Sequence, residues 1–195
     1  MGTLLALVAF IVVISVTPGP NTVLLWASGA TFGFRATLRH VLGTALGIGS
    51  MALVTAAGLG ALFTALPEVG VAMKVAASAY LLYLAYQVAG ARALERGESA
   101  HPLGIVQAAA FQAINPKGWI LALGAVTTFL PPGLPPLAGG LVVAAVMAAV
   151  VIPTQALWAG AGGTLGRLLT GERTRQLVSL GLATLLVATV IDVWV

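Results

Sequence analysis

The chain has 195 residues, of which 59% are hydrophobic and only 7% are charged. Soluble domains carry about 25% charged residues, because charge keeps their surface in water. This composition excludes a water-soluble globule and predicts a protein whose surface faces lipid. The net charge of +4 does not indicate a nucleic-acid partner, because the basic residues lie in short gaps between apolar runs.

The first apolar stretch, 4–28, follows no basic segment, and no small-residue cleavage site comes after it. We therefore expect a first membrane span rather than a removable signal peptide. Five more stretches have the roughly 20 mostly apolar residues that a transmembrane helix needs. They are residues 40–64, 70–91, 103–130, 136–163 and 176–195. The sequence thus predicts an all-α integral membrane protein of six transmembrane helices.

All seven arginines fall in the first, third and fifth connections between these stretches. The three connections are Gly33 to Arg39, Arg92 to Pro102 and Arg167 to Arg175. Short loops rich in Lys and Arg stay in the cytoplasm. The charge pattern therefore predicts that both termini lie outside.

The spans also show internal order. Pro18 and Pro116 interrupt the first and fourth spans and lie 98 residues apart (116 − 18), about half the chain. The same offset carries the second and third spans onto the fifth and sixth. This pattern predicts one domain, 1–195, built as a 3+3 inverted repeat with halves of approximately 1–98 and 99–195. Evenly spaced helices could also match by coincidence, and that alternative stays open.

Two motifs break the predicted helices inside the membrane. The first, residues 17–21, reads Thr-Pro-Gly-Pro-Asn, and its two prolines remove two backbone donors. The second, residues 115–118, reads Asn-Pro-Lys-Gly, in which Asn is a favoured N-cap and Pro a favoured first helical residue. A helix that begins inside a bilayer presents free N–H groups and the positive end of its dipole, which suit a carboxylate. With the ammonium of Lys117, two such ends would form a cationic cradle.

These motifs, together with a nearby amide side chain that is costly in lipid, define the predicted substrate site. The residues expected to bind substrate are Thr17, Pro18, Gly19, Pro20, Asn21, Gln112, Asn115, Pro116 and Lys117. Three alternatives stay open: proline kinks occur without any ligand, the amides could merely bridge helices, and Lys117 could extend to the cytoplasmic interface.

The sequence resembles the LysE/RhtB family of small bacterial amino-acid exporters. The resemblance rests on Pro-Gly-Pro in the first span, Asn-Pro-Lys in the fourth and the triplet 79–81, Ala-Tyr-Leu, in the third. It implies export of small amino acids or their derivatives across the bacterial cytoplasmic (inner) membrane, driven by the proton gradient. Residues 28–39 and 127–131 look closest to exporters of cysteine and O-acetylserine. Some relatives carry a polar or acidic residue where residues 47–50 offer only a serine hydroxyl, which puts a second-span carboxylate mechanism in doubt.

Few ionisable residues lie within the spans. His40, beside Arg39, is expected at the membrane interface, with a proton-relay role as the alternative. Asp192 is expected to be an interfacial carboxylate facing water, with titration during coupling as its alternative.

Two glycine pairs, Gly43 with Gly47 and Gly162 with Gly166, are spaced four residues apart. This small-xxx-small spacing lets helices approach closely. We expect the contacts to lie within one subunit. Whether the chain forms a homodimer stays open.

Other chemistry finds no support in the sequence. The chain has no cysteine, no His/Cys/Asp/Glu cluster, no Ser/His/Asp set, no P-loop and no dinucleotide fingerprint. We therefore expect no enzyme, no metal site and no cofactor, and the expected partners are an amino-acid substrate and the lipid bilayer. The alternatives are an exporter of metal ions or other small solutes and a non-transporting subunit of a membrane complex.

Overall fold

The computed structural model describes residues 2–59, 67–89, 101–168 and 171–194, and these residues form helices and short connections without a strand. The helices are α1 (Gly2–Val16), α2 (Pro20–Phe32), α3 (Phe34–Val54) with a π-helical turn η1 (Thr55–Leu59), α5 (Pro67–Ala89), α6 (Ile105–Ile114), α7 (Pro116–Phe129), α8 (Pro136–Leu168) and α9 (Glu172–Trp194).

Two of the described helices are single apolar rods long enough to cross a membrane. They are Phe34–Gly58, with a mean hydropathy of 1.6, and Pro136–Arg167, with a mean hydropathy of 2.3. A third candidate span is the pair α1 and α2, whose axes are bent by 62° at the break between them. The protein is therefore an all-helical membrane protein with at least two clear spans.

The first connection is shorter than predicted. We expected a loop from Gly33 to Arg39, but α3 begins at Phe34, so both Arg35 and Arg39 lie on a helix with exposed side chains. The reason is Gly33, whose φ of +84° suits glycine and turns the chain within one residue. Its N–H ends α2 on the Gly29 carbonyl. The other two predicted arginine-rich connections lie partly outside the described residues.

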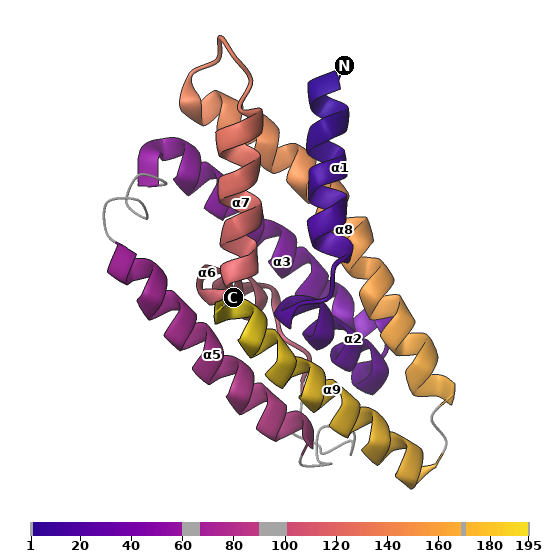
Figure 1. Cartoon of the computed structure of the whole chain (residues 1–195). Helices are drawn as coiled ribbons and strands as arrows, with labels where there is room; N and C mark the ends of the chain where they lie inside the picture. The colour runs from indigo at the N-terminus through magenta and orange to yellow at the C-terminus, as the bar shows by residue number, and fades with distance from the viewer. Residues whose placement is uncertain (1, 60–66, 90–100, 169–170, 195) are drawn as a thin grey trace.

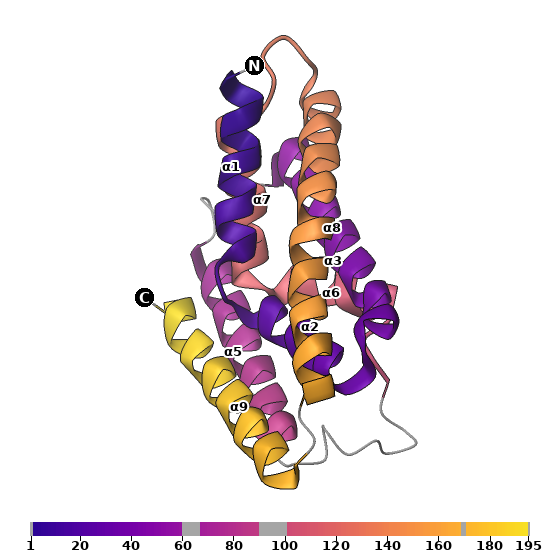
Figure 2. The same cartoon turned by 90° about the vertical axis from the view of Figure 1, so that its right-hand side faces the viewer.

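The two helix breaks lie partway along the bundle and separate one end of it from the other (Figures 1 and 2). The half-helices α1 and α7 extend from the breaks to the end that carries the N-terminus and the 130–135 loop. The half-helix α2 lies below the end of α1, and α6 runs crosswise at the lower end of α7 in the view of Figure 2. The long helices α3 and α8 pass beside both sets of half-helices.

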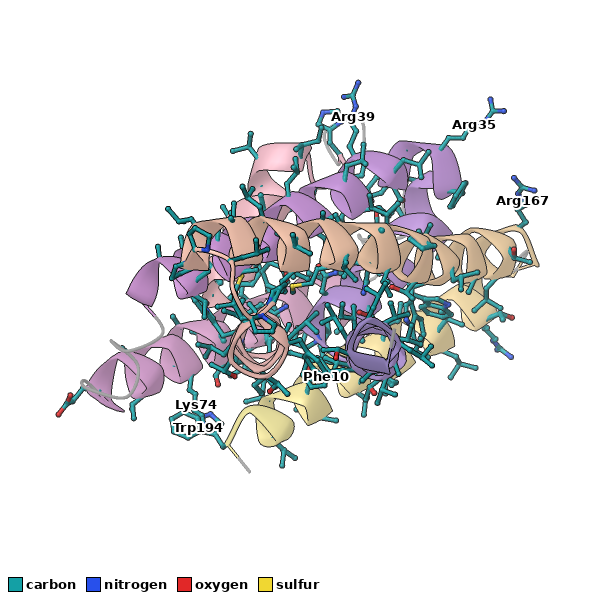
Figure 3. The ribbon with its side chains drawn as sticks, turned by 90° about the horizontal axis from the view of Figure 1, so that it is seen from above. Phe10, Arg35, Arg39, Lys74, Arg167 and Trp194 are labelled. Carbon is teal, nitrogen blue, oxygen red and sulfur yellow. The ribbon has the colours of Figure 1, made fainter. Side chains whose placement is uncertain are left out.

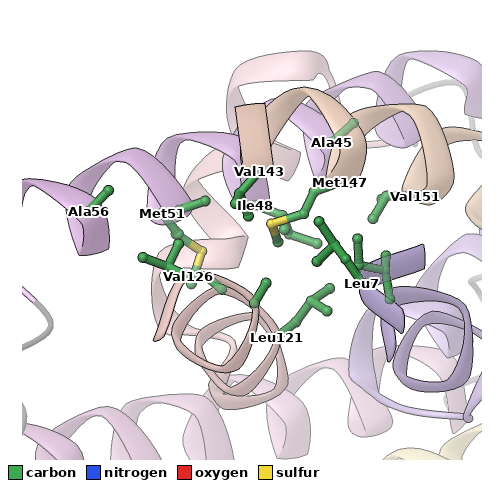
Figure 4. Close-up of a cluster of buried hydrophobic side chains, with 14 residues drawn as sticks. Leu7, Ala45, Ile48, Met51, Ala56, Leu121, Val126, Val143, Met147 and Val151 are labelled. Carbon is green, nitrogen blue, oxygen red and sulfur yellow. The ribbon is translucent and has the colours of Figure 1, made fainter. Parts of the chain in front are cut away.

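A large apolar cluster fills the half of the bundle around α1 and α7 (Figure 4). Helices α1, α3, α7 and α8 all contribute to it. Its fully buried members include Ile11, Val143, Met147 and Val151. In water, burial of such side chains would be worth about 25 cal/mol for each Å² of apolar surface. Between helices in lipid, the attraction comes from close van der Waals packing of these side chains.

Glycine brings the half-helices α2 and α6 unusually close to the long helices. A Cβ built on Gly162 of α8 would lie 2.0 Å from the Trp26 carbonyl oxygen of α2, and one on Gly166 would lie 2.2 Å from the Ala30 oxygen. In the same way, a Cβ on Gly43 of α3 would lie 2.4 Å from a carbonyl oxygen of α6. The prediction that both glycine pairs pack within one subunit is confirmed for the described residues.

Helices α5 and α9 pack mainly against each other beside this bundle (Figures 1 and 2). Leu81 of α5 and Leu186 of α9 belong to a smaller buried cluster that includes Val23 of α2. Seen from above, Lys74 of α5 lies beside Trp194 of α9, with its Nζ 5.8 Å from the ring centroid, whereas the arginine side chains extend away from the bundle (Figure 3).

Candidate substrate site

The first helix break leaves the start of α2 without a side-chain cap. Helix α1 ends at Val16 and α2 begins at Pro20, as the two prolines predict. Gly19 stands at the N-cap position in an extended conformation and has no side chain to offer. The Thr22 hydroxyl fixes this backbone, because it accepts from the Gly19 N–H at 2.7 Å and donates to the Gly19 carbonyl at 2.8 Å.

The second break has a side-chain cap. Helix α6 ends at Ile114, and α7 begins at Pro116. Asn115 stands at the N-cap of α7, and its Oδ1 accepts from the Lys117 N–H at 3.2 Å. The predicted cap and the predicted helix start are therefore both present.

Lys117 joins the two breaks. Its Nζ donates to the carbonyl oxygen of Thr17 and, at 3.2 Å, to that of Pro18. These carbonyls follow the last turn of α1, where helix carbonyls lack partners and the dipole is negative. The ammonium is thus held by the main chain of the opposite break.

Asn21, in the first turn of α2, is the centre of a buried network of polar side chains. Its Oδ1 accepts from Gln112 Nε2 at 2.9 Å, from His40 Nε2 at 3.2 Å and from Thr44 Oγ1 at 3.3 Å. Its Nδ2 donates to Gln155 Oε1 at 3.3 Å. Helices α2, α3, α6 and α8 each supply at least one member. An amide oxygen with three donors and an amide nitrogen with a defined acceptor can adopt only one orientation.

The network continues to the second break. Asn115 Nδ2 donates to Gln112 Oε1 at 2.9 Å. Asn115 Oδ1 in turn accepts from the Lys117 N–H. The amide side chains of Asn21, Gln112 and Asn115 therefore form a hydrogen-bonded chain that ends at the start of α7. Buried networks of this kind fix the geometry of a site, because each member loses free energy if its partner moves.

The two breaks face a common cavity. The cavity has a volume of about 30 Å³, room for about two water molecules. Its polar lining comes from both helix starts and from the network, and its apolar lining includes Ile14, Ile48 and Leu121. The polar lining residues are Ser15, Gly19, Asn21, Thr22, Gln112, Asn115, Lys117, Gly118 and Gln155.

The structure brings the predicted site residues together. Five of the nine line the cavity: Gly19, Asn21, Gln112, Asn115 and Lys117. The other four form the breaks themselves: Thr17 and Pro18 supply the carbonyls that bind Lys117, whereas Pro20 and Pro116 are the first residues of α2 and α7. Whether these residues bind a substrate stays a prediction.

His40, which was predicted at the membrane interface, lies on α3 with its side chain inside the bundle. Its side chain is only 1% exposed and lies in the network described above. The prediction assumed that residues 33–39 form a loop, but α3 begins six residues before His40, which carries the imidazole about 9 Å along the helix. The Asp192 side chain lies outside the described residues.

Sequence reasoning also missed Thr44 of α3 and Gln155 of α8. A signal was available for α3, because Thr37, His40 and Thr44 recur at intervals of three and four residues and all face the interior. Gln155 follows Pro153 within a long apolar helix, and a glutamine at that depth is costly unless it is paired. Only the fold shows that its partner is Asn21.

Metal ligands do not gather in the described part of the chain. No group of three or more His, Cys, Asp or Glu side chains lies close enough there to hold a metal ion. Ser50, the hydroxyl noted in the second predicted span, donates to the carbonyl of Gly47 in its own helix.

Together these features define a helical membrane protein with interrupted helices that meet at a buried polar site, an arrangement typical of membrane transporters. A sequence profile of the LysE type translocator family matches residues 12–193, and the chain belongs to this family. It is therefore a membrane transport protein and not an enzyme.

Individual relatives carry more specific names. Proteins named cysteine/O-acetylserine efflux protein from Escherichia coli strain K12 and from Shigella flexneri are each 29% identical to this chain over 159 residues. A protein of the same name from Escherichia coli O139:H28 is 28% identical. Each alignment covers 82% of this chain and 82% of the relative. No solved structure matches the chain.

Proposed function

We propose that this protein is a secondary transporter that exports small amino acids or their derivatives from the cytoplasm across the bacterial inner membrane, driven by the proton gradient. The names of the cysteine/O-acetylserine efflux proteins support the substrate class and the direction. The polar cavity at the two helix breaks supports the location of the site.

One observation carries the proposal: Lys117 of one break donates to main-chain carbonyls of the other. This contact places a cationic ammonium beside partly negative carbonyl oxygens, which are suitable partners for the carboxylate and the ammonium of an amino-acid zwitterion. A substrate carboxylate would pair with the Lys117 ammonium and with the N–H groups at the uncapped start of α2. The substrate ammonium would take the place of Lys117 at the carbonyls of Thr17 and Pro18.

The cavity is not fully enclosed, but apolar packing and close helix contacts border it on two sides. Toward α1 and α7 the cavity meets Ile14, Ile48 and Leu121, which belong to or pack against the large apolar cluster. On the other side, α2 is held close to α8 at Gly162 and Gly166. A volume of about 30 Å³ is too small for an amino acid, so substrate binding requires the groups that line the cavity to move apart. A tight cavity favours small substrates.

The proposal includes six spans arranged as a 3+3 inverted repeat. The first span of each half would be the broken one, α1 with α2 and α6 with α7. The pairing of α5 with α9 supports the repeat, since these helices would be the last spans of the two halves. The arginines of α3 and α8 favour a cytoplasmic position for the ends that carry them and an external position for both termini.

Lys117→Ala in proteoliposomes tests the proposed site. The measurement is exchange of labelled cysteine, O-acetylserine and other small amino acids against the same unlabelled compound. Lys117 is partly buried, and a hydrogen bond to a charged group is worth about 1.5–3 kcal/mol, so we expect exchange at low substrate concentration to fall at least ~10-fold.

Lys74→Ala is the matched control, because Lys74 is the other lysine of the chain and lies on α5 beside Trp194. It should exchange substrate within about twofold of the wild type, since a partly exposed cation–π contact is worth ~0.5–1 kcal/mol to stability and lies outside the site. Equal exchange by Lys117→Ala and wild type would contradict the proposed role of Lys117. Failure of the wild type to exchange any amino acid would contradict the proposed function itself.

A further inference from the structure

We propose that His40 is the proton-binding site of this transporter and that its Nδ1 carries the proton exchanged for the substrate. This inference rests on the proposed function and adds the residue that couples export to the proton gradient.

The hydrogen bonds of His40 fix its tautomer. Its Nε2 lies 3.2 Å from Asn21 Oδ1, an oxygen that also accepts from Gln112. Because that oxygen cannot donate, Nε2 carries a hydrogen and donates it. In the neutral imidazole Nδ1 then holds a lone pair, and within the described residues this buried atom has no hydrogen-bond partner. A proton can therefore add at Nδ1 without breaking an existing bond.

The groups around His40 are neutral amides and hydroxyls. The nearest polar side chains are Asn21 of α2, Thr44 of α3 and Gln112 of α6. The described charged side chains of the same and adjoining helices do not hydrogen-bond to the imidazole. Three arginines are exposed: Arg35 and Arg39 of α3 and Arg167 of α8. Lys117 of α7 is bound to the first break. Glu68, the acid among the described side chains, is exposed at the start of α5.

Protonation of His40 would act on the substrate site through Asn21. The Asn21 oxygen already accepts from three donors, although a carbonyl oxygen has two lone pairs. An imidazolium is a stronger donor than a neutral imidazole, so protonation favours the bond from His40 at the expense of the bonds from Thr44 and Gln112. Gln112 in turn holds Asn115, whose oxygen caps the start of α7 at Lys117. The chain of contacts thus links the imidazole to the ammonium proposed to bind substrate.

The proton balance defines the coupling. One proton adds to Nδ1 from the outer side, and the same proton leaves Nδ1 toward the cytoplasm when substrate binds there. Substrate therefore favours the neutral imidazole, and by linkage the proton disfavours substrate to the same extent. Binding of substrate to the purified protein should release a proton.

Vesicle assays with labelled cysteine, kept reduced, separate coupling from transport. The first measurement is exchange without a pH gradient, and the second is accumulation driven by a pH gradient. We expect His40→Gln, which keeps a donor toward Asn21 but cannot take a proton, to lower the ratio of driven accumulation to exchange at least tenfold. His101→Gln, which removes the other histidine of the chain, should keep the wild-type ratio, because His101 is exposed.

The outcomes distinguish this inference from the proposed function. A wild-type ratio in His40→Gln overturns the inference, as does a wild type whose exchange is intact but whose accumulation ignores the pH gradient. A wild type that neither exchanges nor accumulates amino acids overturns the proposed function instead.

A second measurement leaves His40 unchanged, in case His40→Gln does not fold. The His101→Gln protein, labelled with ¹⁵N-histidine, has a single imidazole. Its nitrogen resonances should show the Nε2–H tautomer at high pH, protonation at Nδ1 as the pH falls, and loss of that proton when cysteine is added. An imidazole that never titrates while the protein stays folded, or whose titration is unaffected by bound cysteine, overturns the inference.

Discussion

The close approach of α2 to α8 makes Gly162→Ala the sharpest test of how the first break is held in place. The added Cβ would lie 2.0 Å from the Trp26 carbonyl oxygen and 2.8 Å from its carbon, whereas ordinary contact begins at 3.4 Å. The backbone of α2 must therefore retreat by about 1.4 Å (3.4 − 2.0) along this line. The obstacle is main chain, which cannot rotate aside as a side chain can.

The expected cost follows from this displacement. Overpacking of a close-packed interior costs about 1–3 kcal/mol, and the gain from replacing Gly by Ala in a helix offsets ~0.5–1 kcal/mol of it. We expect the free energy of unfolding to fall by about 1–2 kcal/mol. Substrate exchange should fall as well, because a site tolerates displacements of only about 0.5 Å and Asn21 lies on the helix that moves.

The measurement is reversible unfolding in detergent micelles, followed by loss of helical circular dichroism. Gly181→Ala is the matched control, because a Cβ at Gly181 of α9 would meet no atom within 4 Å. That variant should keep or raise the stability by up to ~1 kcal/mol. If Gly162→Ala is as stable as Gly181→Ala, the close packing of α2 on α8 is wrong.

The remaining predictions concern the site and the orientation. Gly19→Ala places a Cβ 2.9 Å from Lys117 Cδ, which belongs to a flexible side chain that can move. We expect substrate exchange to fall about tenfold, equivalent to ~1.4 kcal/mol. The free energy of unfolding should change by less than ~1 kcal/mol. A loss of stability without a loss of exchange would refute this reasoning. Since the chain has no cysteine, Leu134→Cys and Arg173→Cys report orientation: a membrane-impermeant maleimide should label the first in intact cells and the second only after permeabilisation, and the reverse pattern would invert the proposed topology.

The two helix breaks could be predicted because their causes are local. Proline lacks a backbone N–H, and Asn before Pro is a good helix start, so residues 17–21 and 115–118 mark the interruptions wherever the rest of the chain lies. The interior position of Asn21 and Gln112 also follows from local chemistry, because an amide is costly in lipid. These two residues contact each other directly.

The partners within the network could not be predicted, because they come from helices far apart in the sequence. Asn21 and Gln155 are separated by 134 residues, and no sequence spacing links them. The burial of His40 could not be predicted for a different reason: the arginines beside it suggested a loop, whereas α3 continues through them with their side chains outward. Charged residues at a membrane surface can lie on a helix as readily as in a loop.

The central claim is that the two helix breaks bind an amino acid with its carboxylate at Lys117. Lys74→Arg leaves Lys117 as the only lysine of the chain, so solid-state NMR on protein with ¹⁵Nζ-lysine and cysteine labelled with ¹³C at the carboxylate can measure this one contact. We predict a dipolar coupling that places the two labels within about 4 Å, the range of an ion pair. Bound cysteine whose carboxylate shows no coupling to Lys117 Nζ would contradict the account.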